Sequence, residues 1–313
     1  MISAERPHLY VTSTTHAGRL GKNNEDRYAV AAYQLSEGDP IPSLLAIIAD
    51  GIGGHRAGEV AAELAVESIL RIVSESDGNR PQDILQQALT ETSVLIRGQA
   101  EADPLRKGMG ATCVCAWVIG DRLYATHAGD SRLYLIRHGN IRQLTIDHTW
   151  VQEAIENGIL TPEQAHRHPN AHIIRRYLGS RAPLEPDFRL RLHPDENDAQ
   201  SYANQGFHLL PADCLLLCSD GLTDLVSQEE ILGILLEDSE PPSDNQSTTH
   251  QLALSQLVDL ANARGGHDNI TIISLQNPSK PGKLMPRISP HFLKWNFRRS
   301  RRISPRSRIN RQA

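Results

Sequence analysis

The sequence contains few aromatic residues, few cysteines and no long apolar run. Phe, Trp and Tyr make up only 4% of the 313 residues, so a folded core has to consist mainly of Leu, Ile, Val and Ala. No stretch reaches the roughly 18 apolar residues that a membrane-spanning helix requires. The N-terminal residues also lack the apolar segment of a signal peptide. These absences together predict a cytoplasmic protein.

The four cysteines lack the Cys-x-x-Cys spacing that is typical of metal-binding pairs. They occur as Cys113 with Cys115 and as Cys214 with Cys218, each pair within an apolar segment. Residues two or four positions apart in a strand point to the same face of a sheet. We therefore predict that all four are reduced, buried thiols with a role in packing.

Basic residues are concentrated at the C-terminus. Residues 277–313 contain three Lys and eight Arg without any Asp or Glu, whereas the preceding 276 residues are acidic. Five prolines in the same segment argue against a packed domain. We predict a folded body over 1–276 and a basic tail over 277–313. The tail is either disordered, docked on the acidic body, or in contact with an anionic membrane, a nucleic acid or an acidic partner. Nothing indicates a coiled coil, so a monomer is expected.

The order of apolar patterns predicts an α+β fold. Short apolar runs at 44–49 and 214–218 predict strands that are buried on both faces. Apolar residues at helical spacing predict helices over 57–73 and over 81–99, the second beginning at a proline. Segments 111–119, 122–128 and 132–137 are separated by Gly and Asp turns, which predicts a three-stranded antiparallel meander. Antiparallel strands with paired helices are typical of layered α+β domains.

Five aspartates occupy similar positions at the ends of predicted strands. Asp50 and Asp220 each follow an apolar run, and Asp26, Asp130 and Asp268 lie in Gly- or Asn-containing turns beside a strand. One such aspartate is usually only a turn residue. Five converging carboxylates would repel one another unless a cation neutralised them, and Mg²⁺ and Mn²⁺ prefer oxygen ligands. The residues alone thus predict metal-assisted chemistry on an oxyanion and no more.

Seven motifs between residues 8 and 275 resemble, in order, those of the protein phosphatase 2C family, the metal-dependent Ser/Thr phosphatases, in its compact bacterial form. The motifs are Asn24-Glu25-Asp26, Asp50-Gly51-Ile52-Gly53-Gly54-His55, Gly108-Met109-Gly110-Ala111-Thr112, His127-Ala128-Gly129-Asp130-Ser131-Arg132, Asp147-His148-Thr149, Ser219-Asp220-Gly221 and Gly265-Gly266-His267-Asp268-Asn269. The resemblance implies a four-layer α-β-β-α sandwich, in which helix pairs flank two central antiparallel sheets. It also implies that segment 148–178 is a flap beside the active site.

The resemblance further implies a centre with two or three divalent cations, Mn²⁺ or Mg²⁺. In such a centre Asp50 bridges two cations and Gly51 contributes its carbonyl oxygen. Asp220 and Asp268 bind one of the two cations, and Asp26 reaches the other. Asp130, with Asp220 shared, binds an additional, weaker cation. The expected reaction is hydrolysis of phosphoserine and phosphothreonine in proteins by a hydroxide bridging the two cations, in opposition to a Ser/Thr kinase.

Two details of the expected site remain open at this point. His55 is the best candidate for the general acid that protonates the leaving serine oxygen. The alternative is a histidine that merely lines the turn. Many members grip the substrate phosphate with an Arg where this chain has Gly21. Arg19 and Lys22 flank that position and are expected to substitute for it with weaker phosphate affinity.

The missing Arg also motivates an alternative function. A weakly active or inactive member of the family would act as a phosphoprotein-binding signalling module. A metallohydrolase of small phosphoesters is a third possibility. Both remain open from the sequence, although the five aspartates favour the phosphatase.

Overall fold

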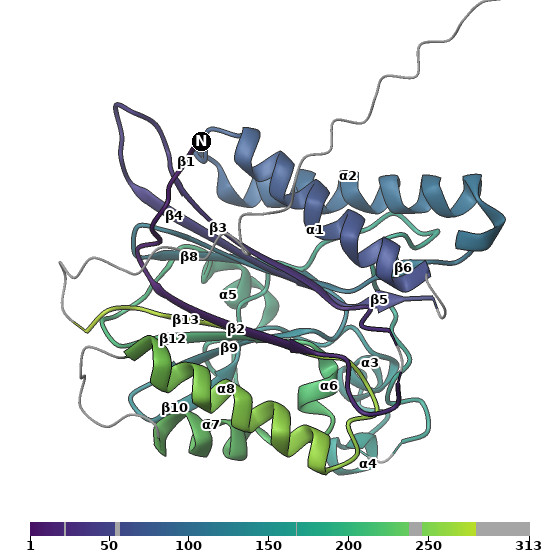
Figure 1. The fold of residues 1–313 in the computed structure, drawn as a ribbon. Helices are drawn as coiled ribbons and strands as arrows, with labels where there is room; N and C mark the ends of the chain where they lie inside the picture. Colours follow the sequence, from purple (N-terminus) through teal and green to yellow (C-terminus); the bar gives the residue numbers. More distant parts are fainter. Residues whose placement is uncertain (22, 54–56, 167, 238–245, 280–313) are drawn as a thin grey trace, which may run out of the picture.

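The computed structural model describes residues 1–279 except 22, 54–56, 167 and 238–245, and its body consists of two antiparallel sheets packed face to face (Figure 1). The first sheet has the order β1-β3-β4-β7-β8-β11 and the second the order β10-β9-β12-β13-β2. The strands of the first sheet are β1 (Ile2–Ser3), β3 (Arg27–Gln34), β4 (Pro42–Ala49), β7 (Cys113–Ile119), β8 (Arg122–Ala128) and β11 (Phe207–His208). Those of the second are β2 (Tyr10–His16), β9 (Arg132–Arg137), β10 (Asn140–Gln143), β12 (Cys214–Cys218) and β13 (Ile270–Gln276).

Helices cover the outer face of each sheet, which makes four layers (Figure 1). The first sheet packs against α1 (Ala57–Glu75) and α2 (Pro81–Ala102), and the second packs against α7 (Gln228–Glu237) and α8 (Gln246–Ala263). The shorter elements are β5 (Gly51–Ile52), β6 (Gly110–Ala111), η1 (Pro104–Arg106), α3 (Trp150–Glu156), α4 (Pro162–His166), α5 (Asp198–Ala203) and α6 (Asp220–Thr223). The predicted four-layer α+β sandwich is confirmed.

Strand β4 has an uninterrupted apolar run because both of its faces are buried. Leu45 and Ile47 pack into the core beneath α1 and α2, whereas Leu44 and Ile48 pack into the core between the two sheets. A strand in a central layer has no face toward water, so polar and apolar residues do not alternate along it. The two predicted helices are also confirmed. They begin at residues 57 and 81, as expected, and they extend beyond the predicted ends to 75 and 102.

The predicted three-stranded meander is wrong in its third strand. β7 and β8 form the expected antiparallel hairpin, but β9 lies in the second sheet, between β10 and β12. The chain crosses between the sheets at Gly129, whose φ of 115° is not readily adopted by other residues. A Cβ on this glycine would lie 2.6 Å from the Cβ of Thr112. Asp130 therefore lies on the crossing between the two sheets.

The prediction for the cysteines is confirmed, since all four are buried and none forms a disulfide. Among the described residues, no helix is both long and apolar enough to cross a membrane.

Candidate metal centre

The five predicted aspartates meet at one end of the sandwich. Asp50 directly follows β4 and Asp220 begins the short helix after β12, while Asp26 and Asp268 precede β3 and β13. Asp130 lies in the crossing from β8 to β9. The negative charges of the other four all raise the pKa of Asp50. The fold thus converts five separate strand ends into one acidic cluster.

Burial is the main cause of the high proton affinity of these carboxyl groups. It raises the pKa of Asp50 well above its usual range, and neighbouring carboxylates add to the effect. Burial likewise raises the pKa of Asp26 to about 6, against the opposing hydrogen bond from Ser219. For Asp130, burial and then the charge of Asp147 raise the pKa to about 7. Without a bound cation, burial of these aspartates therefore lowers the stability of the folded protein.

Three of the aspartates have a carboxylate oxygen without a hydrogen-bond partner among the described residues. They are Oδ1 of Asp26, of Asp130 and of Asp220, and each is buried. Buried polar atoms in folded proteins nearly always have a partner. An oxygen-preferring divalent cation would supply one partner to several carboxylates at once and would neutralise their charge. The donor atoms present in this cluster therefore fit Mg²⁺ or Mn²⁺.

Glycine allows α1 to approach β5, which directly follows Asp50. A Cβ on Gly51 would lie 2.3 Å from the carbonyl carbon of Gly58 in the first turn of α1, and a Cβ on Gly58 would lie 2.8 Å from that of Gly51. On the other side, the backbone of Asp50 is bonded to Thr112. The N–H of Thr112 donates to the Asp50 carbonyl oxygen at 2.8 Å, and the Asp50 N–H donates to Thr112 Oγ1 at 3.1 Å. Asp50 is therefore fixed from both sides.

Asn269 and Ser219 connect the loops that carry the other aspartates. The side chain of Asn269 accepts a hydrogen bond from the N–H of Glu25 at 2.7 Å, and its backbone N–H donates to Asp268 Oδ1 at 2.9 Å. Ser219 Oγ donates to Asp26 Oδ2 at 2.8 Å and accepts from the N–H of Thr271 at 3.0 Å. Both residues belong to motifs of the sequence, but their hydrogen-bond partners could not be predicted from those motifs.

Asp224 is a sixth carboxylate that sequence reasoning missed. It lies four residues after Asp220, and the negative charges of Asp220 and Asp224 interact. Burial raises the pKa of Asp224, and His172 lies 3.4 Å from its carboxylate. The signal that could have revealed it is the spacing itself, since residues four apart lie on one face of a helix.

A second group of possible metal ligands, His127, His148 and Asp187, is better explained by internal hydrogen bonds. Their potential ligand atoms lie within 4.8 Å of one another. However, the N–H of Gly129 donates to His148 Nδ1, so the ring proton is on Nε2 and is donated to Asp187 at 3.1 Å. Arg189 binds the same carboxylate at 2.6 Å. A guanidinium in this position would repel a cation, so we do not assign this group as a metal site.

Of the three residues predicted to act on the substrate, only Arg19 is among the described residues. His55 and Lys22 lie outside the described residues. Arg19 is exposed, its backbone N–H donates to the carbonyl oxygen of Gly266 at 2.7 Å, and its guanidinium lies 3.4 Å from the carbonyl oxygen of Asn262 near the end of α8. The Arg19 side chain therefore contacts the C-terminal end of α8.

Comparison with known proteins identifies the family. The family model described as protein phosphatase 2C matches residues 12–154. A putative protein phosphatase 2C-type protein of Streptococcus pyogenes is 32% identical over 275 residues, which are 87% of this chain and 99% of the relative. The chain belongs to the protein phosphatase 2C family. The resemblance predicted from the seven motifs is thus confirmed, and this protein phosphatase 2C is a hydrolase of phosphoproteins.

Solved structures of serine/threonine phosphatases share the fold of this protein phosphatase 2C. The enzyme of Streptococcus agalactiae is 30% identical with a TM-score of 0.70, over 85% of this chain and 98% of that one. The catalytic domain of the phosphatase PstP, solved in complex with two manganese ions, is 32% identical with a TM-score of 0.65, over 86% of this chain and 97% of that one.

Proposed function

We propose that this serine/threonine protein phosphatase binds two or three divalent cations, Mn²⁺ or Mg²⁺, at its acidic cluster and uses them to hydrolyse phosphoserine and phosphothreonine in proteins. The observation that carries the proposal is the convergence of five buried or half-buried aspartates, three of which have an unpartnered carboxylate oxygen. The two manganese ions bound to the related PstP domain support it.

The proposed ligand roles are those implied by the family's motifs, whose five aspartates the fold brings together. Asp50 would contact both principal cations and Gly51 would contribute its carbonyl oxygen, while Asp220 and Asp268 would hold one cation and Asp26 the other. Asp130, together with Asp220, would hold the additional, weaker cation. Asp224 is a further candidate for that additional cation, because its charge is coupled to that of Asp220.

When bound, such cations provide an activated water at neutral pH and stabilise the charge on the entering and leaving oxygens of an in-line displacement. The protein contributes rigidity to this arrangement. Thr112 fixes the backbone of Asp50, Ser219 orients the carboxylate of Asp26, and Asn269 connects the loops of Asp26 and Asp268. Fixed ligands need no reorganisation during the reaction, which is the basis of electrostatic catalysis.

The deciding experiment is phosphate release from a phosphothreonine peptide, with Mn²⁺ or with EDTA, by wild type, Asp220→Ala and the control Asp121→Ala. Asp121 is an exposed residue paired only with His208 in the described structure. We expect Mn²⁺-dependent turnover that falls at least 100-fold in Asp220→Ala and is unchanged in Asp121→Ala. No turnover by folded, Mn²⁺-loaded wild type would instead favour the phosphoprotein-binding module. Equal turnover of small phosphoesters and the peptide would favour a small-molecule phosphohydrolase.

For the substrate phosphate we propose Arg19 and Lys22 as weak substitutes for the Arg that is absent at Gly21, and His55 as the general acid. Arg19→Ala or Lys22→Ala is expected to raise KM more than it lowers kcat, because a substrate-binding contact is lost. An unchanged KM in both variants would contradict the assignment.

We also propose that the catalytic unit ends near Gln276, the last residue of β13, and that residues 277–313 form a separate basic tail. The tail beyond residue 279 lies outside the described residues. Its charge suits an anionic membrane, a nucleic acid or an acidic partner, and an opposing Ser/Thr kinase is the expected functional counterpart of the enzyme. Equal binding of the full chain and of a variant lacking 277–313 to anionic vesicles, RNA and candidate partners at low salt would remove the proposal for the tail.

A further inference from the structure

The motif Asp147-His148-Thr149 has no role in the proposed metal centre, although each of its residues makes a distinct contact. The Asp147 carboxylate pairs with Arg132 through two nitrogens, at 2.7 and 3.0 Å. Thr149 Oγ1 accepts a hydrogen bond from the N–H of Gln152 and thereby caps α3. His148 lies between these two residues, and its contacts lead to the turn that carries Asp130.

His148 is bonded twice to Gly129, the residue before Asp130. Its backbone N–H donates to the Gly129 carbonyl oxygen at 2.9 Å, and the Gly129 N–H donates to His148 Nδ1 at 3.1 Å. Because Nδ1 accepts a hydrogen bond, the ring is neutral and its proton is on Nε2. That proton is donated to Asp187 Oδ2 at 3.1 Å. One imidazole therefore joins the Gly129 turn to a buried carboxylate.

Further contacts of Asp187 and His127 fix the position of the imidazole. Asp187 accepts hydrogen bonds from Arg189 Nη2 and Nε at 2.6 and 2.9 Å. The backbones of Asp187 and His127 exchange two hydrogen bonds, at 3.0 and 3.1 Å. The rings of His127 and His148 are stacked, with centroids 4.6 Å apart and planes 2° from parallel. His148 consequently has no freedom to move away from Gly129 without breaking buried contacts.

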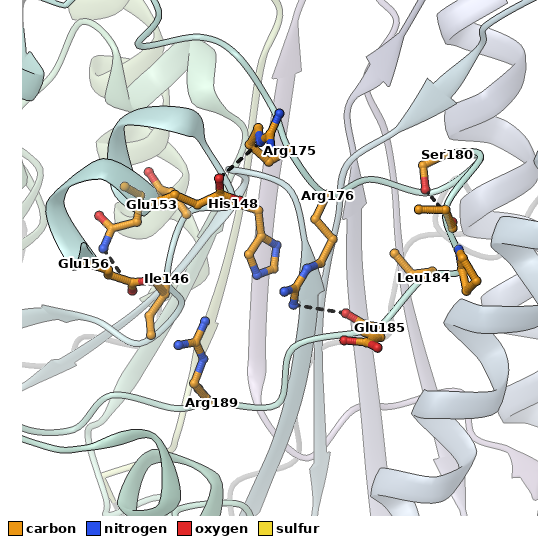
Figure 2. A pocket seen from close by; sticks show the side chains of 14 residues that line it. Ile146, His148, Glu153, Glu156, Arg175, Arg176, Ser180, Leu184, Glu185 and Arg189 are labelled. Atoms are coloured by element: carbon orange, nitrogen blue, oxygen red, sulfur yellow. Dashed lines mark hydrogen bonds and ion pairs between the residues drawn. The ribbon is translucent and has the colours of Figure 1, made fainter. Parts of the chain in front are cut away.

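The same residue closes the base of the segment that contains α3 and α4. The N–H of Arg175 donates to the His148 carbonyl oxygen at 2.7 Å, and Thr149 pairs with Ile174 as an isolated bridge. His148 lines a pocket of about 260 Å³. Figure 2 shows it near Arg189 and near Arg175 and Arg176, which lie in the irregular segment after α4. Contacts at His148 thus connect this segment to the Asp130 turn.

The Asp130 turn needs such an external support. Gly129 adopts a positive φ of 115° and has no side chain that could fix the turn. Asp130 Oδ1 has no hydrogen-bond partner among the described residues, so no hydrogen bond of its own holds this oxygen in place. We propose that His148 is a positioning residue of this phosphatase, whose imidazole fixes the Gly129–Asp130 turn and thereby aims the Asp130 carboxylate at the additional cation. This inference rests on the proposed role of Asp130 as a ligand.

Two substitutions test the two hydrogen bonds of the imidazole separately, the one from the Gly129 N–H and the one to Asp187. In His148→Asn the amide lies near the position of Nδ1, so it can accept from the Gly129 N–H but cannot reach Asp187. In His148→Gln the amide lies near the position of Nε2, so it can donate to Asp187 but leaves the Gly129 N–H unpaired. If His148 affects Mn²⁺ binding only through the stability of the fold, His148→Asn, which loses the contact with Asp187, should weaken Mn²⁺ binding at least as strongly as His148→Gln.

The measurement is a titration of EDTA-treated protein with Mn²⁺, in which free Mn²⁺ is detected by electron paramagnetic resonance. One Mn²⁺ site should be lost in Asp130→Ala. We expect His148→Gln to lower the Mn²⁺ affinity of that same site by about 10-fold, as is typical of residues that orient a metal ligand. His148→Asn should stay within about 3-fold of wild type. In the Asp130→Ala background, His148→Gln should change the remaining Mn²⁺ affinities by less than 2-fold.

The outcomes distinguish this inference from the proposed function. If Asp130→Ala binds as many Mn²⁺ ions as wild type with the same affinity, the role of Asp130 as a ligand is wrong, and this inference with it. If Asp130→Ala loses a site but His148→Gln binds like wild type, or weakens binding equally in both backgrounds, only the positioning role is wrong. Thermal unfolding of every variant confirms that it is folded.

A measurement on the wild-type protein covers the case in which His148→Gln does not fold. In ¹⁵N-labelled, Mg²⁺-loaded protein, the hydrogen bond from Gly129 to His148 Nδ1 should give a nitrogen–nitrogen coupling across the bond. Detection of the coupling supports the contact on which the inference depends, and its absence overturns it.

Discussion

At the scale of single residues, the carboxylates proposed to bind the cations lower the stability of the metal-free protein. Burial and mutual repulsion raise the pKa values of Asp26, Asp50, Asp130 and Asp220. In the metal-free protein at neutral pH, the folded state therefore either takes up protons or tolerates repulsion, and both lower its stability relative to the unfolded chain. A bound cation would remove this cost.

Asp50→Asn should therefore stabilise the metal-free protein while it abolishes catalysis. The neutral amide has nearly the shape of the carboxylate but does not repel its neighbours. We expect the free energy of unfolding in EDTA to rise by about 1–2 kcal/mol, and the increase in Tm that Mn²⁺ gives the wild type to shrink strongly. Differential scanning calorimetry with and without Mn²⁺ tests this. The exposed control Asp83→Asn should change the stability by less than about 0.5 kcal/mol, and a loss of stability in Asp50→Asn with EDTA would contradict the explanation.

At the scale of elements, the position of α1 depends on close packing of its first turn against β5. Gly51 and Gly58 approach so closely that neither position has room for a Cβ. The helix N-terminus is thereby held beside the turn that follows Asp50. This contact between a strand end and a helix start determines where the Gly51 carbonyl group lies.

Gly58→Ala should therefore disturb the metal centre as well as the fold. The added methyl group would lie 2.3 Å from Glu25 Oε2 and 2.8 Å from the backbone of Gly51, so α1 and β5 have to separate. We expect a loss of about 1–3 kcal/mol in the free energy of unfolding and weaker Mn²⁺ binding. The matched control is Gly98→Ala in α2, where a Cβ meets nothing within 4 Å. It should gain about 0.5–1 kcal/mol from helix propensity. Urea unfolding and Mn²⁺ titration of both variants would show whether the close approach matters.

At the scale of the whole molecule, two histidines whose surroundings keep the ring neutral limit stability at acidic pH. Burial lowers the pKa of His8, between β1 and β2, to about 4, and that of His127 also to about 4. A lowered histidine pKa means that the unfolded chain binds the proton more readily than the folded one. The stability that each histidine contributes is therefore fully present above pH 6.5 and is lost as the pH falls from 6.5 toward 4.

Replacing His8 should reduce this pH dependence without touching the metal centre. Between pH 7 and pH 5, the free energy of unfolding of wild type should fall by up to about 2 kcal/mol more than that of His8→Gln. Urea unfolding at several pH values, with both proteins in EDTA, isolates the difference because the acidic cluster is common to both. Parallel pH profiles would show that His8 keeps its ordinary pKa in the folded protein.

The five aspartates, the long helices and the apolar strands could all be predicted from the amino-acid sequence, because each depends on a short segment whose residue pattern is visible locally. The motifs also identified the family before any fold was known. Three features became visible only in the folded protein: β9 joins the second sheet, Asp224 belongs to the acidic cluster, and His148 is hydrogen-bonded to the Gly129 turn. Sheet membership and side-chain convergence depend on how distant segments pack, and a local pattern of polar and apolar residues does not encode which distant strand or carboxylate lies opposite.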